Sequence, residues 1–82
     1  MMKYLFAFLM LLFCNQPAWA YNVAQAKADL KQGRYAETTE QLRQLVKTDT
    51  GNYEAWFLFG VALVHEQQYH QAIEAFRQVI AL

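Results

Sequence analysis

The chain has 82 residues, which is enough for one small domain and too few for several. Its seven basic and seven acidic residues give a formal net charge of zero, so we expect no electrostatic attraction to nucleic acid or to an acidic membrane surface. The hydrophobic fraction is 56%, but apolar residues are concentrated at the start of the chain, which therefore needs an interpretation of its own.

The first segment, residues 1–20, has the features of a secretory signal peptide. Lys3 precedes an uninterrupted apolar run, and Ala18 and Ala20 form an Ala-x-Ala cleavage site. The apolar run covers residues 4–13 and is shorter than the ~20 residues that a membrane-spanning helix needs. We therefore expect cleavage after Ala20 and export to the periplasm. The alternative is a membrane-anchored chain, held by an uncleaved or lipidated N-terminus.

The chain has one cysteine, Cys14, which lies within the predicted signal peptide. The mature chain then has no thiol, so it forms no disulfide and holds no cysteine-based metal site.

Two helices are predicted in the first part of the mature chain. The first covers residues 22–32, where apolar side chains recur at helical spacing. Gly33 follows it and can adopt the positive φ that often ends a helix. The second helix covers residues 36–47, and its apolar stripe ends beside Lys47, a charge that suits the last turn. The polar segment 48–52 then predicts a turn.

Two further helices are predicted after this turn. The third covers residues 53–67, with Asn52 as its N-cap and Glu54 in its first turn. The fourth covers residues 70–82. No segment alternates apolar and polar residues over the length of a strand, so we predict an all-α fold.

The predicted helices repeat with a period of 34 residues, because residues 33–46 align with residues 67–80. The identical pairs are Tyr35 and Tyr69, Glu40 and Glu74, Arg43 and Arg77, and Gln44 and Gln78. A fixed period of this length indicates stacked units, each unable to bury its apolar face alone. The repeat therefore favours a binding scaffold over an enzyme.

The second unit resembles the tetratricopeptide repeat. That family has the pattern Trp-x2-Leu-Gly-x2-Tyr, then Ala-x3-Phe, then Pro, over 34 residues. The residues at these spacings are Trp56, Phe59, Gly60, Leu63, Ala72 and Phe76. The first unit matches more weakly, since Ala26 replaces the Gly and Asn22 replaces the Trp.

The resemblance implies two antiparallel helix-turn-helix repeats that begin a right-handed α-solenoid. The first repeat is divergent and covers residues 21–52, and the second covers residues 53–82 and stops before the family's terminal turn. The implied repeat core consists of small residues that allow close helix approach and larger ones that fill the space between helices. Its members are Ala26, Leu30, Tyr35, Leu42, Trp56, Phe59, Gly60, Leu63, Tyr69, Ala72 and Phe76.

The resemblance also implies a concave groove lined by the first helix of each repeat. Carried over by position, its candidate lining is Val23, Lys27, Lys31, Asn52, Glu54, Phe57, Val61, Val64 and His65. We expect a peptide or a partner helix to bind there through an apolar anchor. The alternative interpretation of the apolar positions Phe57, Leu58 and Val61 is contact with another repeat.

No constellation of catalytic or metal-binding residues is evident. His65 and His70 are five residues apart, whereas the zinc-protease helix motif needs a spacing of four. The chain has no serine, and its glycines are isolated rather than gathered in a phosphate-binding loop. We therefore predict no enzyme activity, no cofactor and no metal.

The expected function is that of an exported interaction module whose protein or peptide partner the sequence does not identify. The alternative is a structural arm of a longer cell-envelope protein, which positions an enzyme domain absent from this chain. The last residues of the predicted helix 70–82, residues 77–82, are strongly apolar, and the family's polar capping helix does not follow them. We therefore expect either a fragment of a longer protein or self-association through this helix.

Overall fold

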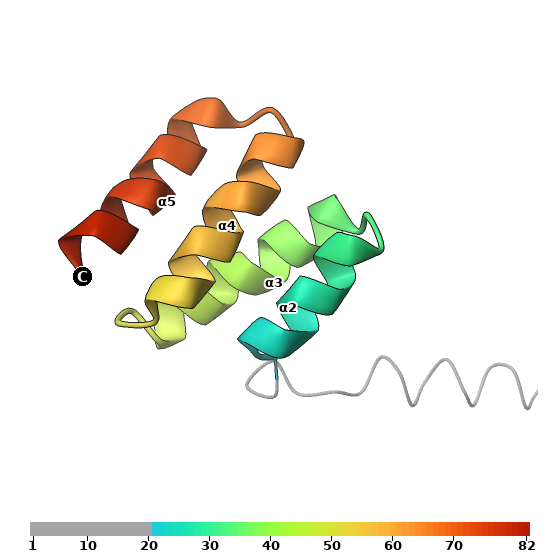
Figure 1. Cartoon of the computed structure of the whole chain (residues 1–82), viewed down its shortest axis with the longest axis horizontal. Coiled ribbons are helices and arrows are strands. Elements are labelled where there is room, and N and C mark those ends of the chain that lie inside the picture. The colour runs from blue at the N-terminus through green and yellow to red at the C-terminus, as the bar shows by residue number, and fades with distance from the viewer. Residues whose placement is uncertain (1–20) are drawn as a thin grey trace, which may run out of the picture.

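The computed structural model describes residues 21–82, and the predicted signal peptide lies outside the described residues. Four helices follow in order: α2 (Val23–Lys31), α3 (Tyr35–Thr48), α4 (Tyr53–His65) and α5 (Tyr69–Ala81). No strand occurs between residues 21 and 82, which confirms the predicted all-α class. Successive helices run in opposite directions, so α2 with α3 and α4 with α5 form two helical hairpins (Figure 1).

Both hairpins turn in the same way. Gly33 and Gln67, one repeat period apart, have positive φ angles of 76° and 62°. In each corner the following residue donates its N–H to a carbonyl in the last turn of the preceding helix, Arg34 to Asp29 at 3.1 Å and Gln68 to Leu63 at 2.9 Å. This is the Schellman arrangement. It explains why α4 ends at His65, two residues before the predicted end of the helix.

The first helix of each hairpin begins with an asparagine cap. The Asn22 side chain accepts a hydrogen bond from the Gln25 N–H at 2.9 Å, and the Asn52 side chain accepts one from the Ala55 N–H at 3.1 Å. These bonds satisfy N–H groups that have no partner within the helix. The turn between the hairpins is fixed further by the Trp56 indole N–H, which donates to the Thr50 carbonyl at 2.8 Å.

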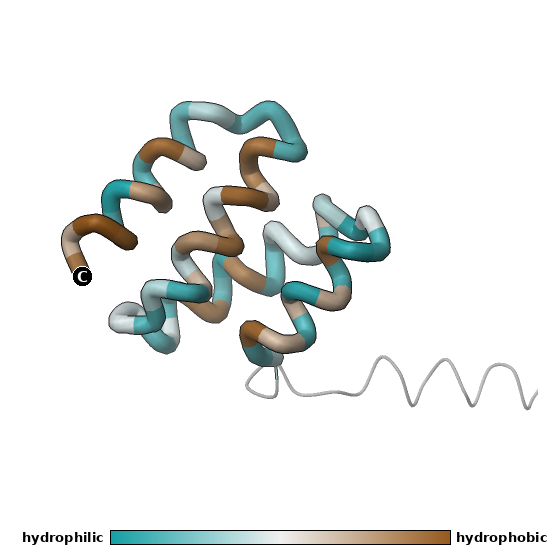
Figure 2. Tube along the Cα trace, viewed as in Figure 1, coloured by the Kyte–Doolittle hydropathy of each residue, from teal (hydrophilic) through white to brown (hydrophobic). Residues whose placement is uncertain are grey.

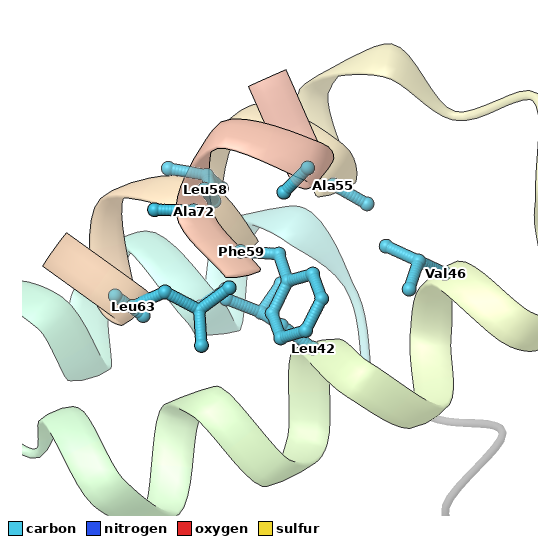
Figure 3. Close-up of a cluster of buried hydrophobic side chains, with 10 residues drawn as sticks. Leu42, Val46, Ala55, Leu58, Phe59, Leu63 and Ala72 are labelled. Carbon is cyan, nitrogen blue, oxygen red and sulfur yellow. The ribbon is translucent and has the colours of Figure 1, made fainter. Parts of the chain in front are cut away.

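The core lies around α4, which contacts each of the other three helices. Figure 2 shows apolar residues along the length of α4, whereas α2 and α3 alternate between apolar and polar positions. The buried apolar residues are Ala26, Leu42, Val46, Ala55, Leu58, Phe59, Ala62, Leu63, Ala72 and Ala75. In the close-up of Figure 3, the Phe59 ring of α4 lies next to Leu42 of α3.

Two threonines are buried in α3 without breaking the helix. The Thr38 hydroxyl donates to the Arg34 carbonyl, and the Thr39 hydroxyl donates to the Tyr35 carbonyl at 2.8 Å. Each hydroxyl is thereby satisfied within its own helix, so its burial carries no penalty for an unmade hydrogen bond.

The predicted core residues differ in burial. Ala26, Leu42, Phe59, Gly60, Leu63 and Ala72 are buried, and Leu30, Tyr35, Trp56 and Phe76 are partly buried. The prediction that Tyr69 belongs to the core is wrong, because 57% of its surface is exposed. The cause is visible at its counterpart in the first unit: the Tyr35 ring is covered by His65 of α4, and no helix within residues 21–82 covers Tyr69 in the same way.

Candidate functional site

A cleft of about 390 Å³ lies along the start of α4, with one lining residue from α2 and one from α5. Its lining consists of Lys27 from α2, Tyr53, Glu54, Phe57 and Leu58 from α4, and Val79 from α5. The first two turns of α4 supply most of this wall because residues three and four apart in a helix share one face. The volume is within the range of pockets that hold small ligands or single side chains of a partner.

An ion pair lies at the rim of this cleft. The Lys27 ammonium is 3.5 Å from the Glu54 carboxylate, so the pair joins α2 to α4 across the boundary between the two units. Their side chains are 58% and 49% exposed. Ion pairs as exposed as this contribute little to stability, so a ligand group can compete for either charge at low cost.

The rest of the wall is apolar and contains two exposed aromatic rings. Tyr53 is 59% exposed and Phe57 is 51% exposed. The Phe57 ring is held from behind by Phe76, with ring centroids 5.8 Å apart and planes tilted by 50°. This tilted geometry is favourable for aromatic pairs. The cleft therefore presents two aromatic side chains to solvent.

The structure divides the predicted groove residues among three places. Lys27, Glu54 and Phe57 meet in the cleft, whereas Val23 and Asn52 line a second cleft. The remaining four line neither of these clefts: Lys31, Val61, Val64 and His65.

Three lining residues of the cleft are absent from the predicted groove: Tyr53, Leu58 and Val79. Tyr53 precedes Phe57 by four residues, and this helical spacing could have identified it. Val79 comes from the second helix of its hairpin, which the groove prediction did not include, and no signal in the sequence points to it.

The second cleft, of about 560 Å³, lies between the start of α2 and the end of α3. Its lining is Tyr21, Asn22, Val23, Gln44, Leu45, Thr48, Asp49 and Asn52. Several of its polar groups are already engaged: both asparagines cap helices, and the Asn52 amide also donates to the Asp49 carboxylate at 3.2 Å. This cleft therefore offers a ligand fewer free polar groups than its residue types suggest.

Tyr21 closes one side of the second cleft. Its hydroxyl donates to the Asp29 carboxylate at 3.4 Å. Burial, together with the nearby Asp29 charge and this hydrogen bond, raises the pKa of the Tyr21 hydroxyl well above its ordinary value. Tyr21 is thus a neutral hydrogen-bond donor at physiological pH.

The histidine pair has different surroundings from those of a metal site. The His65 ring stacks on Tyr35, with centroids 4.1 Å apart and planes within 5° of parallel. No group of three or more His, Cys, Asp or Glu side chains among residues 21–82 is arranged to hold a metal ion. None of the four described helices is long and apolar enough to span a bilayer.

Comparison with known proteins adds one finding to this geometry. A family model described as tetratricopeptide repeat matches residues 29–82, which covers the last turn of α2 and all of α3, α4 and α5. No curated protein and no solved structure matches the chain.

Proposed function

This chain belongs to the tetratricopeptide repeat family of protein-interaction modules, and from that membership we propose that it binds a peptide or partner helix in the cleft along the start of α4. The cleft has an aromatic wall, a rim with one basic and one acidic group, and room for a side chain of a partner. The proposed ligand is an extended peptide or a helix that carries an apolar anchor residue.

The single observation that supports this proposal most strongly is the exposure of the Phe57 ring. The residue lines the cleft, and its ring packs against the ring of Phe76. An exposed aromatic ring in a concave site is the kind of residue around which binding energy concentrates. The Lys27 and Glu54 charges then orient the polar groups that flank the anchor residue of the ligand.

Selection from a library of displayed peptides, followed by fluorescence anisotropy with the selected peptide, tests the proposal. Phe57→Ala should weaken binding at least about tenfold, since it removes the aromatic wall. Tyr69→Ala is the matched control, because Tyr69 is similarly exposed but lies outside the cleft. Equal binding by wild type and Phe57→Ala would contradict the proposed site.

A charge exchange tests the role of the rim. Lys27→Glu places two carboxylates together at the cleft and should change which peptides are selected. The double variant Lys27→Glu with Glu54→Lys restores an ion pair in the opposite direction. It should keep the affinity for the apolar anchor while reversing the preference for flanking charges. An unchanged preference would show that the rim charges do not contact the ligand.

Export to the periplasm is the second part of the proposal, and residues 3–20 of the sequence support it. Expression of the full chain in a Gram-negative host should give a periplasmic product whose measured mass corresponds to a chain that begins at Tyr21. Ala20→Lys should block this cleavage. A full-length product that sediments with membranes would instead support the membrane-anchored alternative.

A further inference from the structure

The predicted cleavage site directly precedes the folded part of the chain. Cleavage after Ala20 leaves Tyr21 as the first residue of the mature chain, and α2 begins at Val23, with Asn22 as its cap. The two residues between the cleavage site and the helix both take part in the fold, as their contacts show. The folded chain therefore has no free spacer on the C-terminal side of the bond that the protease must cut.

Tyr21 is held in place by its side chain. The residue is partly buried and packs against the apolar core. Its hydroxyl donates to the Asp29 carboxylate at 3.4 Å, and the same carboxylate accepts a hydrogen bond from the Gln25 side-chain amide at 3.0 Å. Because Gln25 and Asp29 both belong to α2, Tyr21 holds this position only when α2 is helical.

Asn22 is held by its side chain and its carbonyl. The side chain accepts a hydrogen bond from the Gln25 N–H at 2.9 Å, and the carbonyl accepts one from the Ala26 N–H at 3.1 Å. These bonds begin the helix, so release of Asn22 opens its first turn. A protein that binds a peptide as an extended strand needs the backbone groups of successive residues. From Val23 onward, the folded chain has these groups inside a helix.

We propose that folding of α2 protects the bond between Ala20 and Tyr21 from the signal peptidase, so that the chain is processed only while α2 is open. Cleavage adds one water across this peptide bond and leaves a carboxylate on Ala20 and an amino group on Tyr21. The inference rests on the proposed signal peptide and adds an order of events, in which cleavage comes before Tyr21 docks. A chain that folds first keeps residues 1–20 and with them the apolar run 4–13.

The strength of this protection depends on the stability of α2 alone. Ala26 is the one buried residue of this helix, so α2 should open without unfolding of α3, α4 and α5. A short helix opens and closes much faster than a protease cuts, so the cleavage rate follows the population of the open form. A change in the stability of α2 should therefore appear directly as a change in the rate of processing.

Digestion of the full-length chain by purified signal peptidase in detergent tests the proposal. The double variant Leu42→Asp with Leu63→Asp provides the unfolded reference, because both leucines are fully buried and two buried charges prevent core formation. Circular dichroism verifies that wild type is folded and that the reference is not. The reference should be cut at least about tenfold faster than folded wild type. Mass spectrometry identifies the bond that is cut.

A matched pair of substitutions tests whether α2 itself is responsible. Ala26 in α2 and Ala75 in α5 are 0% and 1% exposed, and glycine weakens the helix at either position. Ala26→Gly should accelerate cleavage of the folded chain by at least about threefold, whereas Ala75→Gly should leave the rate unchanged. Asn22→Ala, which removes the helix cap, should accelerate it as well. Each substitution is repeated in the unfolded reference, where none should change the rate.

Three outcomes would overturn the proposal, and they separate it from the proposed export. If folded wild type and the unfolded reference are cut equally fast after Ala20, the signal peptide is real but α2 does not protect it. If Ala26→Gly and Ala75→Gly accelerate cleavage equally, only global unfolding exposes the bond, and α2 has no special role. If neither wild type nor the reference is cut after Ala20, the predicted signal peptide is wrong, and the inference fails with it.

Discussion

The backbone of Gly60 lies directly against the ring of Phe76. A Cβ atom at Gly60 would be 2.5 Å from Cε1 of Phe76, closer than carbon atoms approach in folded proteins. In the first unit, the equivalent positions hold Ala26 and Leu42, and both residues are fully buried. A larger residue on one helix is thus matched by a smaller one on its partner.

Gly60→Ala should therefore lower the free energy of unfolding by about 1–3 kcal/mol, because the Phe76 ring or the whole of α5 must move. The better helix propensity of alanine offsets about 0.5–1 kcal/mol of this cost. Chemical denaturation followed by circular dichroism measures the change. The rescue variant is Phe76→Leu, which recreates the pair of the first unit. If Gly60→Ala is as destabilising with Leu at position 76 as with Phe, the ring contact is not the cause.

The two helix corners provide a matched pair of backbone substitutions. Gly33→Ala should destabilise the protein by about 1–2 kcal/mol, because a side chain at positive φ is strained. Gln67→Gly should stabilise it by up to about 1 kcal/mol, since the strain of Gln67 is relieved and partly offset by the greater freedom of glycine when unfolded. Thermal unfolding of the two variants should give shifts of opposite sign, and shifts of the same sign would contradict this reading of the corners.

Tyr21 should make stability depend on alkaline pH. Its pKa is raised in the folded state, so the folded state holds the proton more tightly than the unfolded state does. This contribution is fully present below the unfolded value of 10.0 and is lost as the pH rises above it. The unfolding temperature of wild type should fall more steeply above pH 10 than that of Tyr21→Phe. Parallel curves for the two proteins would mean that folding does not raise the pKa of the Tyr21 hydroxyl.

Repeat-equivalent truncations report on which helix faces are covered in solution. Val46→Ala should cost about 2 kcal/mol, because it deletes two buried methyl groups. Ile80→Ala, at the same position of the second unit, should change stability by no more than about 0.5 kcal/mol, since the side chain is exposed. Denaturant titrations at two protein concentrations measure both. A large, concentration-dependent cost for Ile80→Ala would show that a second copy covers α5.

The sequence was sufficient to predict four helices, the turn between the hairpins and the repeat that relates them. These features depend on local patterns, such as apolar spacing, an asparagine cap and Gly33 after a helix. The corner at Gln67 was harder, since glutamine seldom adopts a positive φ, and its repeat alignment with Gly33 was the available signal. A residue at the repeat position of a glycine can therefore adopt the same positive φ as the glycine.

The limits of the prediction appear most clearly at Tyr35 and Tyr69. The two residues are identical and begin equivalent helices, and yet one is stacked on His65 and the other is exposed. Their environments differ because the residue that covers a repeat position belongs to the next unit along the chain, so the repeat pattern alone does not fix burial. The candidate cleft has the same limit: the family resemblance implies Lys27, Glu54 and Phe57 by position, but Val79 reaches the cleft only through the packing of α5.

Helix α2 buries a single residue completely, Ala26, whereas α4 is buried along most of its inner surface. With so little apolar anchoring, α2 is the part of the described structure that should open most readily on its own. It also supplies Lys27 to the cleft. Local unfolding of α2 removes Lys27 from the cleft, so a ligand that contacts Lys27 should stabilise α2 against local unfolding.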